Sequence, residues 1–133
     1  MIGIVIVAHG GLAGEYLAAV EHVVGRQEGV VAISTTAELD REAKQNEISA
    51  AADSVDQGDG VVVVVDMFGG SPSNLSLPAC RKNDRRILYG ANLPMLVKLA
   101  KSRHLPVERA TEMALTAGRK YIDCINAGQE RFT

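Results

Sequence analysis

Short apolar runs alternate with longer segments of mixed polarity along this chain. The runs at 2–8, 29–35, 61–65 and 86–89 are rich in isoleucine, valine and leucine. A short continuous apolar run bounded by glycine or polar residues is typical of a strand that is buried on both faces of a sheet. The pattern therefore predicts a strand at each of these runs.

The segments between these runs carry apolar residues at helical spacing. In the first segment Leu12, Tyr16, Val20 and Val24 recur every four residues, and Gly25 is a suitable C-cap. In the third, Ser71 precedes a proline, which is typical of an N-cap followed by the first helical position. Helices are predicted over 12–24, from about Asp40 to before Gly58, from 71 to about 82, from about 94, and from 106 to about 127.

Alternating strands and helices indicate an α/β domain. Strands that run parallel need a crossover connection, and the helical segments are long enough to supply it. With the first strand in the interior, we expect one open, mostly parallel sheet with a strand order of about 2-1-3-4 and helices on both faces. No repeat or linker interrupts residues 1–133, which we expect to form a single domain.

Composition narrows the classes of function. The chain has 133 residues, of which 47% are hydrophobic and 23% charged, with a formal net charge of −2. It has no basic face for nucleic acid and no apolar stretch of the roughly 20 residues that span a bilayer. The first residues lack the basic flank of a signal peptide, so we expect a cytoplasmic protein. Cys80 and Cys124 fall within predicted helices, and we interpret them as structural thiols rather than metal ligands.

Two of the predicted strands each end in one ionisable group. His9 directly follows the first apolar run, and Asp66 directly follows the five valines at 61–65. If these strands are neighbours, about 4.8 Å apart, the imidazole and the carboxylate can form a hydrogen bond. A carboxylate on one ring nitrogen fixes the tautomer, stabilises a positively charged ring and leaves the other nitrogen free to act as a nucleophile. His9 and Asp66 are therefore the candidate catalytic pair.

Glycine-rich loops flank this pair and suit an anion. Gly10 and Gly11 follow His9, and the segment "GGSPSN" begins three residues after Asp66. Glycines let the backbone come close to a ligand, and the N–H groups at a helix start favour negative charge. A phosphoryl group on His9 is expected to meet both loops. The predicted phosphoryl-binding residues are Gly10, Gly69, Gly70, Ser71 and Ser73.

A simpler interpretation is that His9 has only a packing role, because a histidine at a strand end is often structural. A carboxylate directly after five valines has no packing reason and favours the functional pair. His22 and His104 lack such a partner and are interpreted as surface residues. Asn92, after the fourth run, is either a pocket residue or a turn former. No Walker motif, GxGxxG loop or nucleophile elbow occurs in the sequence.

Three motifs resemble the enzyme IIA domain of the mannose (mannose, fructose, sorbose) family of the bacterial phosphoenolpyruvate-dependent sugar phosphotransferase system. They are "GIVIVAHGGLA" at 3–13, "VVVVVDMFGGSPSN" at 61–74 and "GANLPML" at 90–96, so the resemblance covers essentially the whole chain. It implies a phosphocarrier in which His9 accepts a phosphoryl group from the histidine-containing phosphocarrier protein and passes it to a histidine of an enzyme IIB partner. Asp66 would orient His9, and Ser71 would lie beside the phosphoryl group.

The resemblance also implies an assembly. The family is typically dimeric, with an edge strand exchanged between subunits, so the tail near 128–133 is expected to contribute to a homodimer. Association with a membrane permease would be peripheral. No metal and no organic cofactor is required for transfer between histidines.

Met67 and Phe68 depart from the family pattern, which often has Thr and Trp after the aspartate. A hydroxyl contact to the phosphoryl group is then missing, which leaves the transfer rate open, and both residues join Asn92 as candidate pocket residues. Three alternatives stay open: a regulatory module whose phosphorylation state is the output, the phosphotransferase subunit of dihydroxyacetone kinase, and a small-molecule enzyme with His9 and Asp66 as general base. The "GGSPSN" and "NLPM" segments favour the sugar branch.

Overall fold

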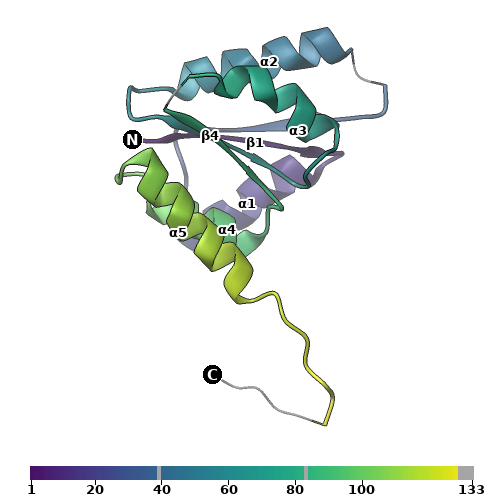
Figure 1. Ribbon diagram of the computed structural model, residues 1–133, viewed down its shortest axis with the longest axis vertical. Coiled ribbons are helices and arrows are strands. Elements are labelled where there is room, and N and C mark those ends of the chain that lie inside the picture. Colours follow the sequence, from purple (N-terminus) through teal and green to yellow (C-terminus); the bar gives the residue numbers. More distant parts are fainter. Residues whose placement is uncertain (39, 83, 129–133) are drawn as a thin grey trace.

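The computed structural model describes residues 1–38, 40–82 and 84–128 and contains one open sheet (Figure 1). Its four strands are parallel and lie in the order β2-β1-β3-β4, which confirms the predicted α/β fold and strand order. All five residues of β3 are buried, as expected for a valine run between two layers of helices. The strands are β1 (Gly3–His9), β2 (Val30–Thr35), β3 (Val61–Val65) and β4 (Arg85–Tyr89).

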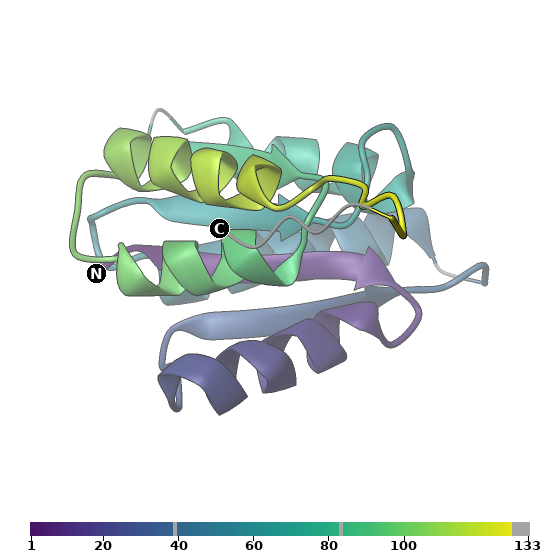
Figure 2. The ribbon, with the colours of Figure 1, turned by 90° about the horizontal axis from the view of Figure 1, so that it is seen from below.

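Helices cover both faces of the sheet, as predicted. Helices α1, α4 and α5 lie side by side on one face, and α2 and α3 cover the other (Figures 1 and 2). Successive side chains of a strand point to opposite faces, so the sheet has a hydrophobic core on each side. Ile6 and Val64 belong to the core under α1, α4 and α5, and Val7 and Val65 belong to the core under α2 and α3. The helices are α1 (Leu12–Val24), α2 (Arg41–Val55), α3 (Ser71–Ser76), α4 (Leu93–Lys101) and α5 (Val107–Lys120).

Local sequence signals fix several helix ends. Asp40 caps α2, since its Oδ1 accepts a hydrogen bond from the backbone N–H of Ala43 at 3.1 Å. Gly25 ends α1 in the left-handed region, with φ 89°, as the predicted C-cap requires. These ends bring the strands back into the sheet at the expected positions.

The third helix is shorter than predicted. Helix α3 ends at Ser76, and a 3-10 turn, η1, follows over Leu77–Cys80. Pro78 has no N–H to donate to the carbonyl four residues earlier, and its ring crowds the preceding turn, so α-helical hydrogen bonding stops there. The N-cap is Gly70 rather than Ser71, which is the first helical residue.

The last helix also ends earlier than predicted, at Lys120 rather than near 127. The apolar residues that extend the helical pattern beyond it are exposed: Tyr121 by 68%, Ile122 by 73% and Ile125 by 61%. A helical turn gains most of its stability from packing of its apolar face. These residues have no such packing, so the pattern alone does not extend the helix. Of the tail near 128–133, for which a dimer contact is predicted, residues 129–133 lie outside the described residues.

The two cysteines differ in environment. Cys80 is half-buried in η1, its Sγ lies 3.7 Å from the carbonyl oxygen of Arg86, and burial raises its pKa to about 11. Cys124 is exposed and lies after α5, so its predicted place within a helix is wrong. No helix in the described ranges is both long enough and apolar enough to cross a bilayer. The single-domain organisation of 1–133 stays a prediction.

Candidate functional site

His9 and Asp66 meet at the carboxyl edge of the sheet. Strands β1 and β3 are parallel neighbours with Val7 opposite Val65, so the chain delivers both residues to the same point of the edge. One carboxylate oxygen of Asp66, Oδ2, accepts two hydrogen bonds from His9. One comes from ring Nδ1 at 2.8 Å and the other from the backbone N–H of His9 at 3.0 Å. The hydrogen bond expected between the two side chains is therefore present. The ring and the main chain of His9 are both hydrogen-bonded to Oδ2 of Asp66.

The electrostatics of the pair fix the roles of the two ring nitrogens. Only 9% of the Asp66 side chain is exposed, against 49% of the His9 side chain. Burial by itself raises the pKa of Asp66, but the hydrogen bonds from the backbone and ring of His9 outweigh it and hold that pKa below its ordinary value. An ionised carboxylate only accepts hydrogen bonds, so Nδ1 carries the proton. In the neutral ring, Nε2 is left with its lone pair.

The free edge of the His9 ring lies against the loop that follows β3. A methyl group added at Gly70 would lie 3.2 Å from ring Cε1 and 3.6 Å from Nε2. Gly70 has φ −85° and ψ 176°, which any residue adopts, so the requirement here is for space rather than for backbone freedom. Gly10 is different: it has φ 55° and turns the chain away directly after His9, with its N–H bonded to the carbonyl of Thr35 at 2.9 Å.

The other predicted phosphoryl-binding residues differ in exposure. Gly69 is exposed with φ 84°, Ser71 is half-buried at the first position of α3, and only 6% of Ser73 is exposed. Within the described ranges, no hydrogen bond joins the hydroxyl of Ser71 or Ser73 to His9 or Asp66. A Cβ added at Gly69 meets nothing within 4 Å, so of the two glycines in this loop Gly70 is the one beside the ring.

Asn92 has a structural role at the start of α4. Its Oδ1 accepts a hydrogen bond from the backbone N–H of Met95 at 3.0 Å, which makes it the N-cap. Its Nδ2 donates to the carbonyl of Gly118 in α5 at 2.8 Å. Because both ends of the amide are used, the structure favours the turn-former interpretation of Asn92 over a pocket residue.

An apolar rim, formed by Leu12, Met67, Phe68, Tyr89 and Leu93, lies at the same edge of the sheet as His9. Each of these side chains is at least 36% exposed, and the rings of Phe68 and Tyr89 lie 4.7 Å apart between centroids at 41°. The sequence pattern does not single out Leu12, Tyr89 and Leu93 as residues of the site. Tyr89 could have been found, since the predicted strand order places the end of β4 beside β3, where Tyr89 stands opposite Val65.

A family model for the IIA component of the fructose phosphotransferase system, named EIIA-man, matches residues 3–115. The matched range includes His9, Asp66 and both glycine loops. The chain belongs to the EIIA-man family. Members are IIA components of the sugar phosphotransferase system and are phosphotransferases in general, which gives this EIIA-man chain a phosphocarrier role within that system.

Individual relatives agree with this assignment. The mannose-specific EIIAB component of Escherichia coli K12 is 30% identical over 129 residues, which cover 95% of this chain and 40% of the relative, so the chain spans less than half of that protein. The crystal structure of EIIA from Streptococcus agalactiae is 29% identical, with a TM-score of 0.78 over 93% of this chain and 97% of that chain. The mannose/sorbose-specific IIA subunit of Enterococcus faecalis is 24% identical, covers 99% of this chain and 98% of its own, and with a TM-score of 0.84 supports the fold.

Proposed function

We propose that this EIIA-man chain carries the phosphoryl group on Nε2 of His9. The observation that supports this most directly is the 2.8 Å hydrogen bond between His9 Nδ1 and Asp66 Oδ2, which leaves Nε2 as the nucleophile. The Nε2 lone pair attacks phosphorus, the bond from phosphorus to the donor nitrogen breaks, and its electron pair returns to the donor. The His9 ring becomes positively charged while Nδ1 keeps its proton, and the carboxylate of Asp66 stabilises that charge.

The donor and the acceptor are other proteins. We infer that the phosphoryl group arrives from the histidine-containing phosphocarrier protein and leaves by in-line attack from a histidine of an enzyme IIB partner. The His9 side chain is 49% exposed and the apolar rim lies at the same edge, which favours a protein surface over an enclosed small-molecule site. The transfer requires no cofactor.

The loops beside His9 supply donors for the phosphoryl oxygens in this proposal. Backbone N–H groups of Gly69, Gly70 and Ser71 lie in the loop after β3, and the Ser71 hydroxyl adds a side-chain donor. The N–H of Gly10, by contrast, is already bonded to the carbonyl of Thr35, so we expect Gly10 to leave room for the group rather than to donate to it. Met67 and Phe68 offer no hydroxyl. We therefore expect backbone N–H groups to provide most of the contacts to the group.

The proposed function is tested by phosphorylation in vitro. Incubation with phosphoenolpyruvate and the general phosphotransferase proteins should add one acid-labile phosphate, as measured by intact mass. His9→Ala should remain unmodified, whereas His22→Ala, at an exposed histidine of α1, should gain the phosphate like the wild type. A wild-type mass that stays unchanged rejects the proposal.

A second pair of variants tests the choice of Nε2. Gly70→Ala places a methyl group beside Cε1 and Nε2 of His9, so phosphorylation should slow by about tenfold, or about 1.4 kcal/mol in the barrier. Gly14→Ala is the matched control, because Gly14 lies within α1, outside both loops, and a Cβ there meets nothing within 4 Å. Equal rates for both variants would show that the phosphoryl group attaches elsewhere.

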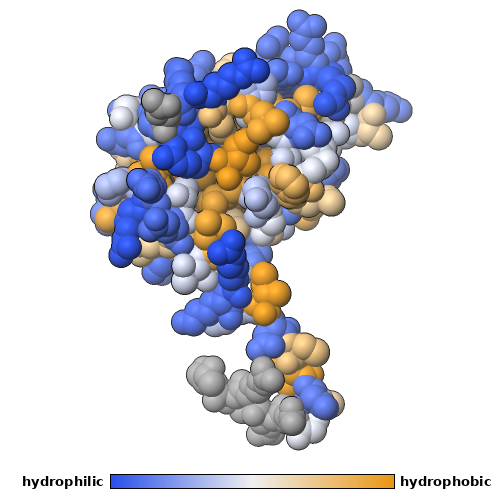
Figure 3. All heavy atoms as spheres, viewed as in Figure 1, coloured by the Kyte–Doolittle hydropathy of each residue, from blue (hydrophilic) through white to orange (hydrophobic). Residues whose placement is uncertain are grey.

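We further propose that the chain works in the cytoplasm, where its phosphoryl donor acts, as a homodimer. Strand β4 pairs with β3, and its other edge is open among the described residues. Figure 3 shows apolar side chains gathered over this strand, between α3 and α5. Open apolar edges recruit further strands, and the exposed Ile122 and Ile125 of a second copy could supply one. Light scattering should give a dimer for the full chain and a monomer after truncation beyond Lys120; a monomeric full chain contradicts the proposal.

A further inference from the structure

A groove of about 620 Å³ lies between α4 and α5, which run side by side (Figure 2). On α4 it is lined at positions 94, 97, 98 and 101, and on α5 at 109, 112, 113, 116, 117 and 120. Both sets follow the spacing of three and four that places residues on one side of a helix. The floor is apolar and half-buried, with Val97 from α4 and Met113 and Ala117 from α5. Each helix thus presents a continuous stripe to one groove, next to the stripe that it packs into the core.

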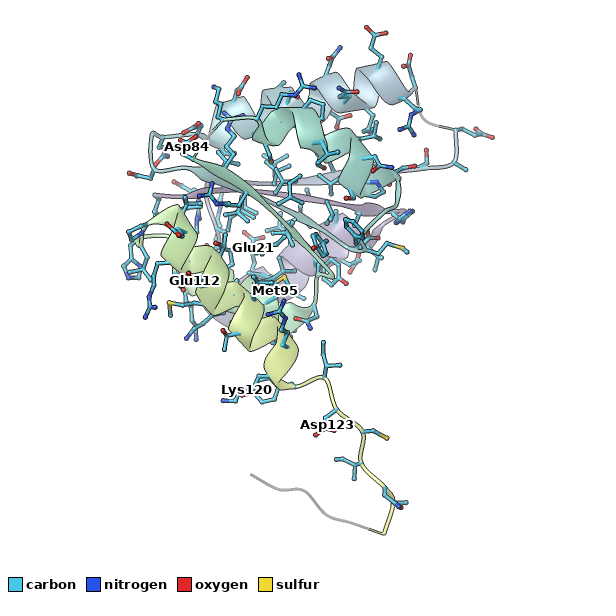
Figure 4. The ribbon with its side chains drawn as sticks, in the orientation of Figure 1. Glu21, Asp84, Met95, Glu112, Lys120 and Asp123 are labelled. Carbon is cyan, nitrogen blue, oxygen red and sulfur yellow. The ribbon has the colours of Figure 1, made fainter. Side chains whose placement is uncertain are left out.

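The groove is strongly positive, although the whole chain has a formal net charge of −2. It is lined by four cationic side chains, Lys98, Lys101, Arg109 and Lys120, and by one carboxylate, Glu112. Over the part of the chain that the structure describes, none of the four cations forms an ion pair. Figure 4 shows Lys120 at the C-terminal end of α5, where it lies 5.4 Å from the ring centroid of Tyr121.

We propose that the α4–α5 groove binds a short, acidic, amphipathic helix of a protein partner. An apolar floor combined with four exposed cations and one carboxylate complements a helix with leucine-like residues on one face and carboxylates at its flanks. Helix α4 has nine residues and is about 14 Å long, which matches two to three turns of a bound helix. The groove is partly open to solvent rather than enclosed, which suits a peptide better than a small ligand that must be enclosed.

This site is separate from the phosphoryl chemistry. None of the groove-lining side chains contacts His9 or Asp66 through a hydrogen bond or ion pair in the described ranges. Binding should therefore be unaffected by His9→Ala. A failure of the groove proposal and a failure of the phosphocarrier proposal can then be told apart, since the first is measured with unphosphorylated protein.

The test uses two designed peptides of about 14 residues, roughly four helical turns, carrying a fluorescent label. Both have leucine at positions i, i+3, i+4 and i+7; one has glutamates at the flanks and the other lysines. Fluorescence anisotropy should show binding of the glutamate peptide that weakens with salt, and at least about tenfold weaker binding of the lysine peptide. Absence of binding of the glutamate peptide, or equal binding of both, overturns the proposal.

Matched variants locate the binding to the groove. The double change Lys98→Glu and Lys101→Glu should lower the affinity for the glutamate peptide by at least about tenfold. The control is Arg26→Glu with Arg41→Glu, which reverses two exposed cations outside the groove and should change the affinity by less than about twofold. Circular dichroism verifies that both double variants fold. An equal loss in the control overturns the proposal, because the attraction would then be to the whole surface.

Two further measurements distinguish a partner helix from other possible occupants of the α4–α5 groove. Met113→Asp should abolish binding by placing a charge on the apolar floor while the thermal unfolding of the protein stays cooperative. If the Lys98→Glu and Lys101→Glu variant instead converts a dimer to a monomer in light scattering, the groove is an interface between copies and the proposal is wrong. If truncation after Lys120 raises the affinity for the glutamate peptide by about tenfold or more, the chain's own tail fills the groove and the proposal is again wrong.

Discussion

Replacing Asp66 with asparagine should slow phosphorylation of His9 while the protein remains folded. In the wild type, Oδ2 of Asp66 accepts the ring Nδ1–H at 2.8 Å and the backbone N–H of His9 at 3.0 Å, and Oδ1 accepts the N–H of Met67 at 3.0 Å. Asparagine has a single acceptor oxygen, so at least one of these donors must face an NH2 group. The negative charge that stabilises a positive ring is lost at the same time.

The size of the effect follows from these contacts. A hydrogen bond to a charged acceptor contributes about 1.5–3 kcal/mol and a neutral one about 0.5–1.5 kcal/mol, so removing the charge beside the ring costs about 1–1.5 kcal/mol. An unpaired donor in this largely buried position adds about 1 kcal/mol or more. Since about 1.4 kcal/mol corresponds to a factor of ten, the rate of phosphorylation should fall roughly 30- to 100-fold.

The assay is the initial rate of phosphate incorporation from phosphoenolpyruvate through the general phosphotransferase proteins. Asp40→Asn is the control, because Asp40 is an exposed N-cap and asparagine caps a helix equally well. Nitrogen NMR of the neutral His9 ring should find the Nδ1–H tautomer in the wild type and a mixture of the Nδ1–H and Nε2–H tautomers in Asp66→Asn. A variant with the wild-type rate and the wild-type tautomer would refute the orienting role of Asp66.

Three further predictions concern stability and reactivity. Because folding lowers the pKa of Asp66, the ionised carboxylate stabilises the native state. The difference in unfolding free energy between the wild type and Asp66→Asn should therefore be largest above the ordinary carboxyl pKa of about 4 and should shrink as pH falls through the lowered pKa. Urea unfolding that gives the same difference at every pH contradicts this prediction. Gly3→Ala places a methyl group against a backbone carbonyl at the end of α2 and should lower Tm by about 5 °C or more in calorimetry. Gly14→Ala places a methyl group in open space on α1, where alanine favours the helix, and should raise Tm by about 2 °C. The exposed Cys124 should react with a thiol-specific disulfide reagent at least about tenfold faster than Cys80, whose pKa is raised to about 11, and the fast phase should disappear in Cys124→Ser.

The strand order and the acid–histidine contact could be predicted because each depends on a strong local signal combined with a topological rule. A run of five valines must be covered on both faces, and two strand ends that each carry one polar group meet when the strands are adjacent. The ends of helices could not be predicted as well. Apolar periodicity continues through Ile122 and Ile125, but both side chains are exposed. A helical turn is stable only where other elements pack against it, and that packing depends on the tertiary structure rather than on the local sequence. Pro78 was visible in the sequence, and its effect on α3 could have been derived.

The topology also explains why the two groups of the site differ so much in exposure. Asp66 directly follows β3, and its carboxylate accepts two hydrogen bonds from His9. In this position 9% of the Asp66 side chain is exposed. After His9, in contrast, Gly10 turns the chain away with φ 55°, so nothing from β1 covers the outer edge of the ring. An acid that must stay ionised and oriented gains from burial among donors, whereas a nucleophile must stay accessible to the group that it attacks. The difference in exposure therefore supports the proposed positioning role of Asp66 and the proposed transfer role of His9, and it predicts that exchanging the two residues yields a protein that cannot be phosphorylated.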